Sequence, residues 1–160
     1  MLRLVLATVF IAHGSQKLFG GFGGGGLFGG LGGGGLSSTA RFMAAHGLTP
    51  GFLFAVLGGL AEFAGGILIA LGLLTVFGAA INIAVQIGAI ATQTWAAGFF
   101  VAQHSGFEYN LVLIAALLAV AAAPGRVSLD HLLLTHLRHA RGPAAPPASA
   151  SVEAVPPHAG

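Results

Sequence analysis

The fold is decided by residues 52–97, which read FLFAVLGGLAEFAGGILIALGLLTVFGAAINIAVQIGAIATQTWAA. Glu62 is the only charged residue of this stretch. Crossing the roughly 30 Å hydrocarbon core of a bilayer takes about 20 mostly apolar residues in a helix, so the stretch is long enough for two passes. Only Thr75 stands between the expected spans at 52–74 and 76–97, which predicts a tight antiparallel helical hairpin.

Two further apolar stretches flank this hairpin. We expect spans at about 2–19 and 107–123, which gives an all-α, polytopic four-helix transmembrane domain over residues 1–127. Of the 160 residues 56% are hydrophobic and 6% charged, and the mean hydropathy is +0.91. So few charges cannot cover a water-soluble domain or bind nucleic acid. The absence of Cys excludes disulfides and thiol chemistry carried by the chain itself.

Positive charges predict the orientation of the chain. An even number of spans places both termini on one side, and Lys17 and Arg41 then flank the opposite side. Cytoplasmic flanks are richer in Lys and Arg, so both termini are expected in the cytoplasm. The basic residues on the side of the termini are Arg3, Arg126, Arg138 and Arg141.

Four segments lie outside the expected spans. Residues 20–36 are mostly Gly with a few Leu and Phe, and they predict a pliable outer loop. Residues 37–47 predict a short helix lying flat on the membrane surface. Residues 128–141 have Leu at helical spacing beside His and Arg, which is typical of an amphipathic cytoplasmic helix on anionic headgroups. The Pro/Ala-rich tail 142–160 is expected to be disordered.

Ionisable residues inside apolar spans are the candidate functional residues, because each costs about 2.5 to 3.5 kcal/mol at the membrane centre. Glu62 shares a helical face with Gly58 and Gly65, which predicts that its carboxyl group points between helices. Seven residues are expected to face one cavity in the outer half of the bundle, as ligand-binding or proton-relay groups. They are His13, Gln16, Lys17, Glu62, Gln86, Gln93 and Glu108.

The same polar residues are also compatible with a purely structural role. They can be interhelical hydrogen-bond glue without any ligand. A bound metal is not expected, because the dense spacing of metal ligands is missing. A haem held by two His would need a second intramembrane His opposite His13, and no span offers one.

The motifs together resemble the DoxX family of small bacterial membrane proteins. The resemblance rests on Arg3, on HGSQKLFGGFGGGG from His13, on HGLTPG from His46, on GGLAEFAGG around Glu62 and on GFEYN from Gly106. It extends over residues 1 to about 130. The long Gly run and the His-containing, Pro/Ala-rich tail depart from the family pattern.

The resemblance implies a four-helix protein of the bacterial inner membrane, associated with thiosulfate, quinone or oxidative-stress redox systems. It maps the family pattern onto His13, Lys17, Glu62 and Glu108. The leading hypothesis is an auxiliary subunit of a membrane redox system that holds a quinone and has no covalent cofactor. Its expected partners are the lipid bilayer and soluble or membrane redox proteins, and no nucleic acid is expected to bind. A noncatalytic scaffold acting through residues 129–141 and a small transporter or proton conductor are the alternatives. No self-contained catalytic motif is present, and homo-oligomerisation is left open.

Overall fold

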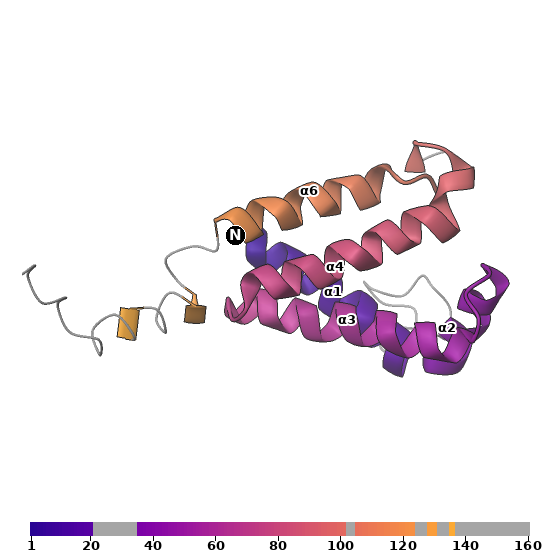
Figure 1. The fold of residues 1–160 in the computed structure, drawn as a ribbon, viewed down its shortest axis with the longest axis horizontal. Coiled ribbons are helices and arrows are strands. Elements are labelled where there is room, and N and C mark those ends of the chain that lie inside the picture. Colours follow the sequence, from indigo (N-terminus) through magenta and orange to yellow (C-terminus); the bar gives the residue numbers. More distant parts are fainter. Residues whose placement is uncertain (21–34, 102–104, 124–127, 131–134, 137–160) are drawn as a thin grey trace, which may run out of the picture.

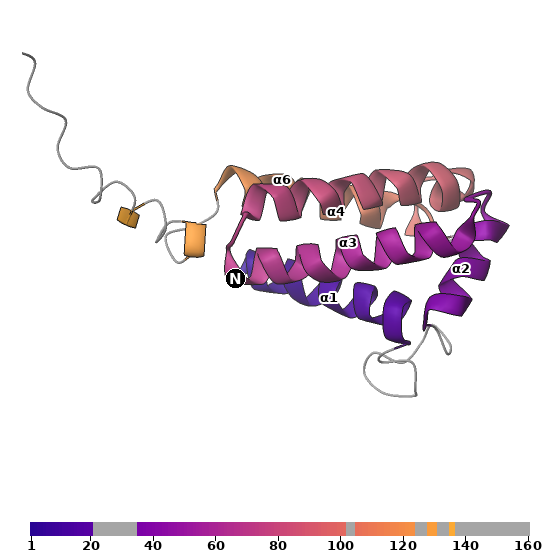
Figure 2. The same cartoon turned by 60° about the horizontal axis from the view of Figure 1, so that its bottom comes forward.

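The computed structural model describes residues 1–20, 35–101, 105–123, 128–130 and 135–136, and within these ranges every regular element is a helix, as the sequence predicts. The elements in chain order are α1 (Leu2–Phe19), α2 (Gly35–Ala45), α3 (Gly51–Leu71), α4 (Thr75–Ala89), the π-helical η1 (Ile90–Thr94), the 3-10 turn η2 (Trp95–Ala97) and α6 (Glu108–Ala122). Helices α1, α3, α4 and α6 lie side by side, and α2 lies across one end of them (Figure 1, Figure 2).

Two of the described helices are long and apolar enough to cross a membrane, namely Gly51–Leu71 and Thr75–Ala97. They correspond to the two spans expected within residues 52–97. The other two expected spans do not meet this standard: α6 is apolar but has only 15 residues, and α1 carries four strongly polar side chains. Those four are Arg3, His13, Gln16 and Lys17.

A glycine ends the first helix of the central hairpin. Helix α3 stops at Leu71, three residues before the predicted end at 74, because Gly72 takes a left-handed conformation with φ 64°. Its N–H then bonds the Ile69 carbonyl, which satisfies an orphan group of the last turn. Leu74 also has positive φ, 48°, and Thr75 begins α4. The reversal therefore occupies Gly72–Leu74, and we call this end of the molecule the turn end.

The segment that follows α6 completes the turn end. Asp130 accepts hydrogen bonds from the backbone N–H of Leu74 at 2.8 Å and of Thr75 at 3.0 Å, and from the Thr75 hydroxyl at 2.9 Å. Its own N–H donates to the Gly72 carbonyl at 2.9 Å. Asp130 thus caps α4. Of the amphipathic helix expected at 128–141, residues 129–130 and 135–136 are helical in the described part of the chain. Residues 131–134 and 137–141 of that helix, the tail 142–160 and residues 21–34 of the Gly-rich loop lie outside the described residues.

The apolar core gathers at the turn end. Phe10 of α1, Ile69 of α3 and Leu117 of α6 are fully buried there, with Leu6, Ala79 and Val120 around them. Small residues bring the helices together: a Cβ on Gly66 would lie 2.9 Å from the Ile11 backbone nitrogen. Toward the opposite end, which we call the α2 end, polar side chains replace this core.

Helix α2 closes the α2 end instead of lying apart from the other helices. Its Met43 is buried, and Gly51 at the start of α3 leaves no room for a side chain beside the Ala40 carbonyl of α2. The Thr39 hydroxyl donates to the Lys17 carbonyl at the end of α1, at 3.1 Å. The short helix expected at 37–47 therefore packs on α1 and α3.

Candidate functional site

A cavity of about 470 Å³ lies between α1, α2, α4 and α6 at the α2 end, with Glu62 of α3 in its wall. Its size falls within the usual range for small-molecule sites. Six of the seven residues predicted from the sequence line it, and Glu108 does not. The six are His13, Gln16, Lys17, Glu62, Gln86 and Gln93.

The central interaction of the cavity joins α1 to α3. Lys17 Nζ lies 2.5 Å from Glu62 Oε2, and the two side chains are 23% and 4% exposed. Gly59 of α3 allows this approach of α1, because a Cβ at position 59 would lie 2.7 Å from Leu18 Cδ2, next to Lys17 in the chain. A carboxylate this deeply buried needs a compensating charge, and Lys17 supplies it.

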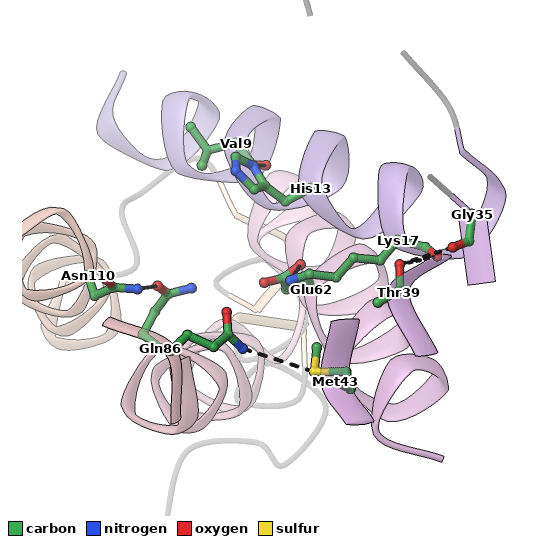
Figure 3. A network of polar contacts seen from close by, with 10 residues as sticks. Val9, His13, Lys17, Gly35, Thr39, Met43, Glu62, Gln86 and Asn110 are labelled. Carbon is green, nitrogen blue, oxygen red and sulfur yellow. Dashed lines mark hydrogen bonds and ion pairs between the residues drawn. The ribbon is translucent and has the colours of Figure 1, made fainter. Parts of the chain in front are cut away.

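His13 lies one turn before Lys17 on the same face of α1 and lines the cavity, but Lys17 is the residue that contacts Glu62 (Figure 3). His13 Nδ1 is 2.9 Å from the Val9 carbonyl oxygen. A carbonyl only accepts, so Nδ1 carries the proton of this bond. In the neutral ring Nε2 is then an acceptor, and it becomes a donor when the imidazole is protonated.

Gln86 forms the wall opposite Glu62. Asn110 Nδ2 of α6 donates to Gln86 Oε1 at 2.7 Å, which fixes the amide and ties α4 to α6. Gln86 Nε2 points toward the side of the cavity where Glu62 lies (Figure 3). A donor and a carboxylate therefore face each other across the cavity.

The π-helical segment supplies the third wall. Gln93 Nε2 lies 4.0 Å from Met43 Sδ of α2, and Thr94 lines the cavity next to it. Thr94 Oγ1 is buried and has no hydrogen-bond partner in the described part of the chain. A buried hydroxyl without a partner is costly, so this atom is a candidate to bind a ligand. Helices lengthened by π turns often occur at functional sites.

Glu108 is the first residue of α6 and does not line the cavity. Its Oε1 accepts a hydrogen bond from the Val101 N–H at 3.1 Å. The N–H of Glu108 donates to the Phe99 carbonyl at 3.0 Å, which fixes where α6 begins and turns Tyr109 and Asn110 toward the cavity. His104, which precedes Glu108 by four residues, lies outside the described residues.

Several lining residues were not predicted as site residues. Met43 and Thr39 come from α2, and their role depends on how that helix folds over the cavity. Asn110 belongs to GFEYN, a motif in which only Glu108 was selected. Among the described residues no three His, Asp or Glu side chains gather to hold a metal ion.

In a comparison with protein families, residues 1–95 match the family model of DoxX. The matched part includes α1, α2, α3 and α4, and with them all six predicted residues that line the cavity. No curated protein and no solved structure matches the chain.

Proposed function

The chain belongs to the DoxX family of membrane-associated proteins, and from this premise we propose that it crosses a bacterial inner membrane four times through α1, α3, Thr75–Ala97 and α6. Both termini then lie in the cytoplasm, as the distribution of Arg and Lys favours. The proposal is supported by the outward faces of these helices, which expose large apolar side chains. Examples are Val5 at 60%, Leu57 at 54%, Phe77 at 59% and Val112 at 64% exposure.

The cavity, in this proposal, binds a quinone-like or other small amphipathic molecule for a membrane redox system of which the chain is an auxiliary subunit. One observation carries it: the Lys17–Glu62 pair, whose carboxylate is buried, faces the Nε2 amide group of Gln86 across a cavity of about 470 Å³ (Figure 3). A quinone carbonyl accepts hydrogen bonds, which Gln86 Nε2 and Lys17 Nζ can donate. A hydroquinone hydroxyl donates, and Glu62 and His13 Nε2 can accept.

The chain's part in the redox reaction is to hold the ligand and move protons. Reducing a quinone to a hydroquinone takes two electrons and two protons. Glu62, Lys17 and His13 are groups that can exchange protons with the ring oxygens. The electrons come from a partner redox protein, soluble or in the membrane.

Interhelical glue is the simplest competing account of the same residues. The buried Thr94 hydroxyl, which has no partner among the described residues, favours a ligand, because a purely structural hydrogen-bond network would satisfy this group within the protein. The scaffold hypothesis depends on residues 129–141, most of which are not described. It stays a prediction, as does the transporter.

The test is a titration of the full chain in nanodiscs with decylubiquinone. Binding is measured as the quenching of the fluorescence of Trp95, the single tryptophan, which neighbours the cavity residue Thr94. Glu62→Gln and Gln86→Leu should each raise Kd by about tenfold or more, because each removes a hydrogen bond to the ligand. Glu108→Gln is the matched control, since Glu108 lies outside the cavity, and its Kd should stay within about twofold.

Three results would count against the proposal. The first is quenching that does not saturate in the wild type. The second is a Kd that Glu62→Gln and His13→Ala leave unchanged. The third is an equal loss of binding in Glu108→Gln, because this would assign the effect to folding and not to the cavity.

A further inference from the structure

Helices α3 and α4 are in tight contact only along part of their length. Next to the turn end, Gly65 lies so close to Asn82 that any side chain at position 65 would collide with the Asn82 amide. A Cβ on Gly78 would lie 3.1 Å from the Gly65 carbonyl oxygen. These two glycines are therefore explained by the close contact of the two helices.

Two glycines farther from the turn have no such explanation. A Cβ on Gly58 of α3 or on Gly88 of α4 would meet no atom within 4 Å. Glycine destabilises the interior of a helix relative to alanine, so an unneeded glycine carries a cost. Figure 1 shows the two helices diverging from their connecting turn toward the side where Gly88 lies on α4.

Gly58 and Gly88 both line a groove of about 400 Å³ between α3 and α4. The groove extends along α4 and η1 from Ile81 to Gln93, which is about 18 Å at 1.5 Å per residue. Most of its lining residues have hydrocarbon side chains or are small, and Lys17, Thr92 and Gln93 are the polar ones. The apolar lining residues include Phe54, Leu57 and Ala61 of α3 and Ile81, Ala84 and Val85 of α4.

The groove adjoins the polar cavity. Lys17, Met43, Ala89 and Gln93 line both spaces, so only these residues stand between the groove and the cavity. The cavity provides polar groups around Glu62, and the groove provides an apolar surface along α4. Leu57, which lines the groove, is 54% exposed.

We infer that this groove holds the hydrocarbon chain of the ligand whose polar head binds in the cavity. The inference rests on the proposed function and narrows its ligand class. The ligand is a ring or head with carbonyl or hydroxyl oxygens that carries one long apolar chain, as a prenylated quinone does. With α3 and α4 crossing the bilayer, the groove opens to the acyl chains, so the ligand enters from the membrane and keeps its chain in an apolar surrounding.

The test compares two probes on the full chain in nanodiscs: decylubiquinone, and the same dimethoxy-methyl-benzoquinone ring without a chain. Gly88→Leu fills the groove and replaces glycine by a strong helix former, so the helix should keep its structure. It should raise the Kd of decylubiquinone by about tenfold or more and leave the Kd of the chainless ring within about twofold. Gly58→Leu should act in the same way from the α3 side.

Ala80→Leu is the matched control, because Ala80 is exposed on α4 and lines neither space. It should change neither Kd. The inference is overturned if Gly88→Leu leaves the Kd of decylubiquinone unchanged, because the groove would then be filled by membrane lipid and not by the ligand. It is also overturned if both probes weaken equally, or if the wild type binds them equally well. If the wild type binds neither probe, the proposed function itself fails.

Discussion

Gly14 of α1 packs directly on the backbone of Phe63 in α3, and a Cβ at position 14 would lie 2.7 Å from Phe63 Cα. Phe63 is the neighbour of Glu62, and Gly14 precedes Lys17 by less than one helical turn. The distance between the helix axes at this point therefore decides whether the ammonium of Lys17 reaches the carboxylate of Glu62.

Gly14→Ala should destabilise the protein by about 1 to 3 kcal/mol, because the backbone of Phe63 cannot move aside as a flexible side chain can. Chemical unfolding in mixed detergent micelles measures the loss. Gly58→Ala is the matched control: its methyl group meets no atom within 4 Å, so it should be neutral or stabilise by up to about 1 kcal/mol. Equal effects of the two substitutions would contradict the close contact at Gly14.

Breaking the ion pair from one side should cost more than removing it. Lys17→Met leaves the buried Glu62 carboxylate without its cation and should destabilise the protein by about 3 to 5 kcal/mol. The double variant Lys17→Met/Glu62→Leu should recover much of that loss, because no buried charge then remains. A double-mutant cycle on unfolding free energies gives the coupling. Strictly additive single effects would show that the two groups do not interact.

The pH dependence of stability should reflect Asp130. The Thr75 N–H bond is the main cause that holds the pKa of Asp130 below its usual range, and the Leu74 N–H, the Thr75 hydroxyl and the Arg3 charge act in the same direction. Because the pKa is lower in the folded state, this stabilisation is complete above about pH 4 and is lost as pH falls through the lowered value.

Asp130→Asn has a single acceptor oxygen and does not titrate. It should lower the melting temperature by a constant amount between about pH 5 and 8, equivalent to about 0.5 to 2 kcal/mol for a lost helix cap. Below about pH 4 the melting curves of the wild type and the variant should approach each other. A difference that grows on acidification would have the wrong sign for this role.

The polar face of each helix could be predicted, because an apolar span tolerates few polar residues and their spacing assigns them to one side. This reasoning was sufficient to predict that Lys17, Glu62 and Gln86 face the same space between the helices. It could not decide among Glu108, Tyr109 and Asn110, since consecutive residues point about 100° apart and α6 begins where loop hydrogen bonds fix it. The roles of Met43 and Asp130 depend on contacts between distant segments, which periodicity does not reveal.

The cap on α4 comes from a residue 55 positions later in the chain. While the ribosome is still making the segment after Thr75, the hairpin of α3 and α4 has to persist with its reversal incomplete, since the group that satisfies these backbone donors has not yet been synthesised. The hydrogen bonds that complete the hairpin thus form only after Asp130 has been synthesised. A chain shortened before that position would keep both apolar helices and lack the hydrogen bonds of Asp130 to the turn between them.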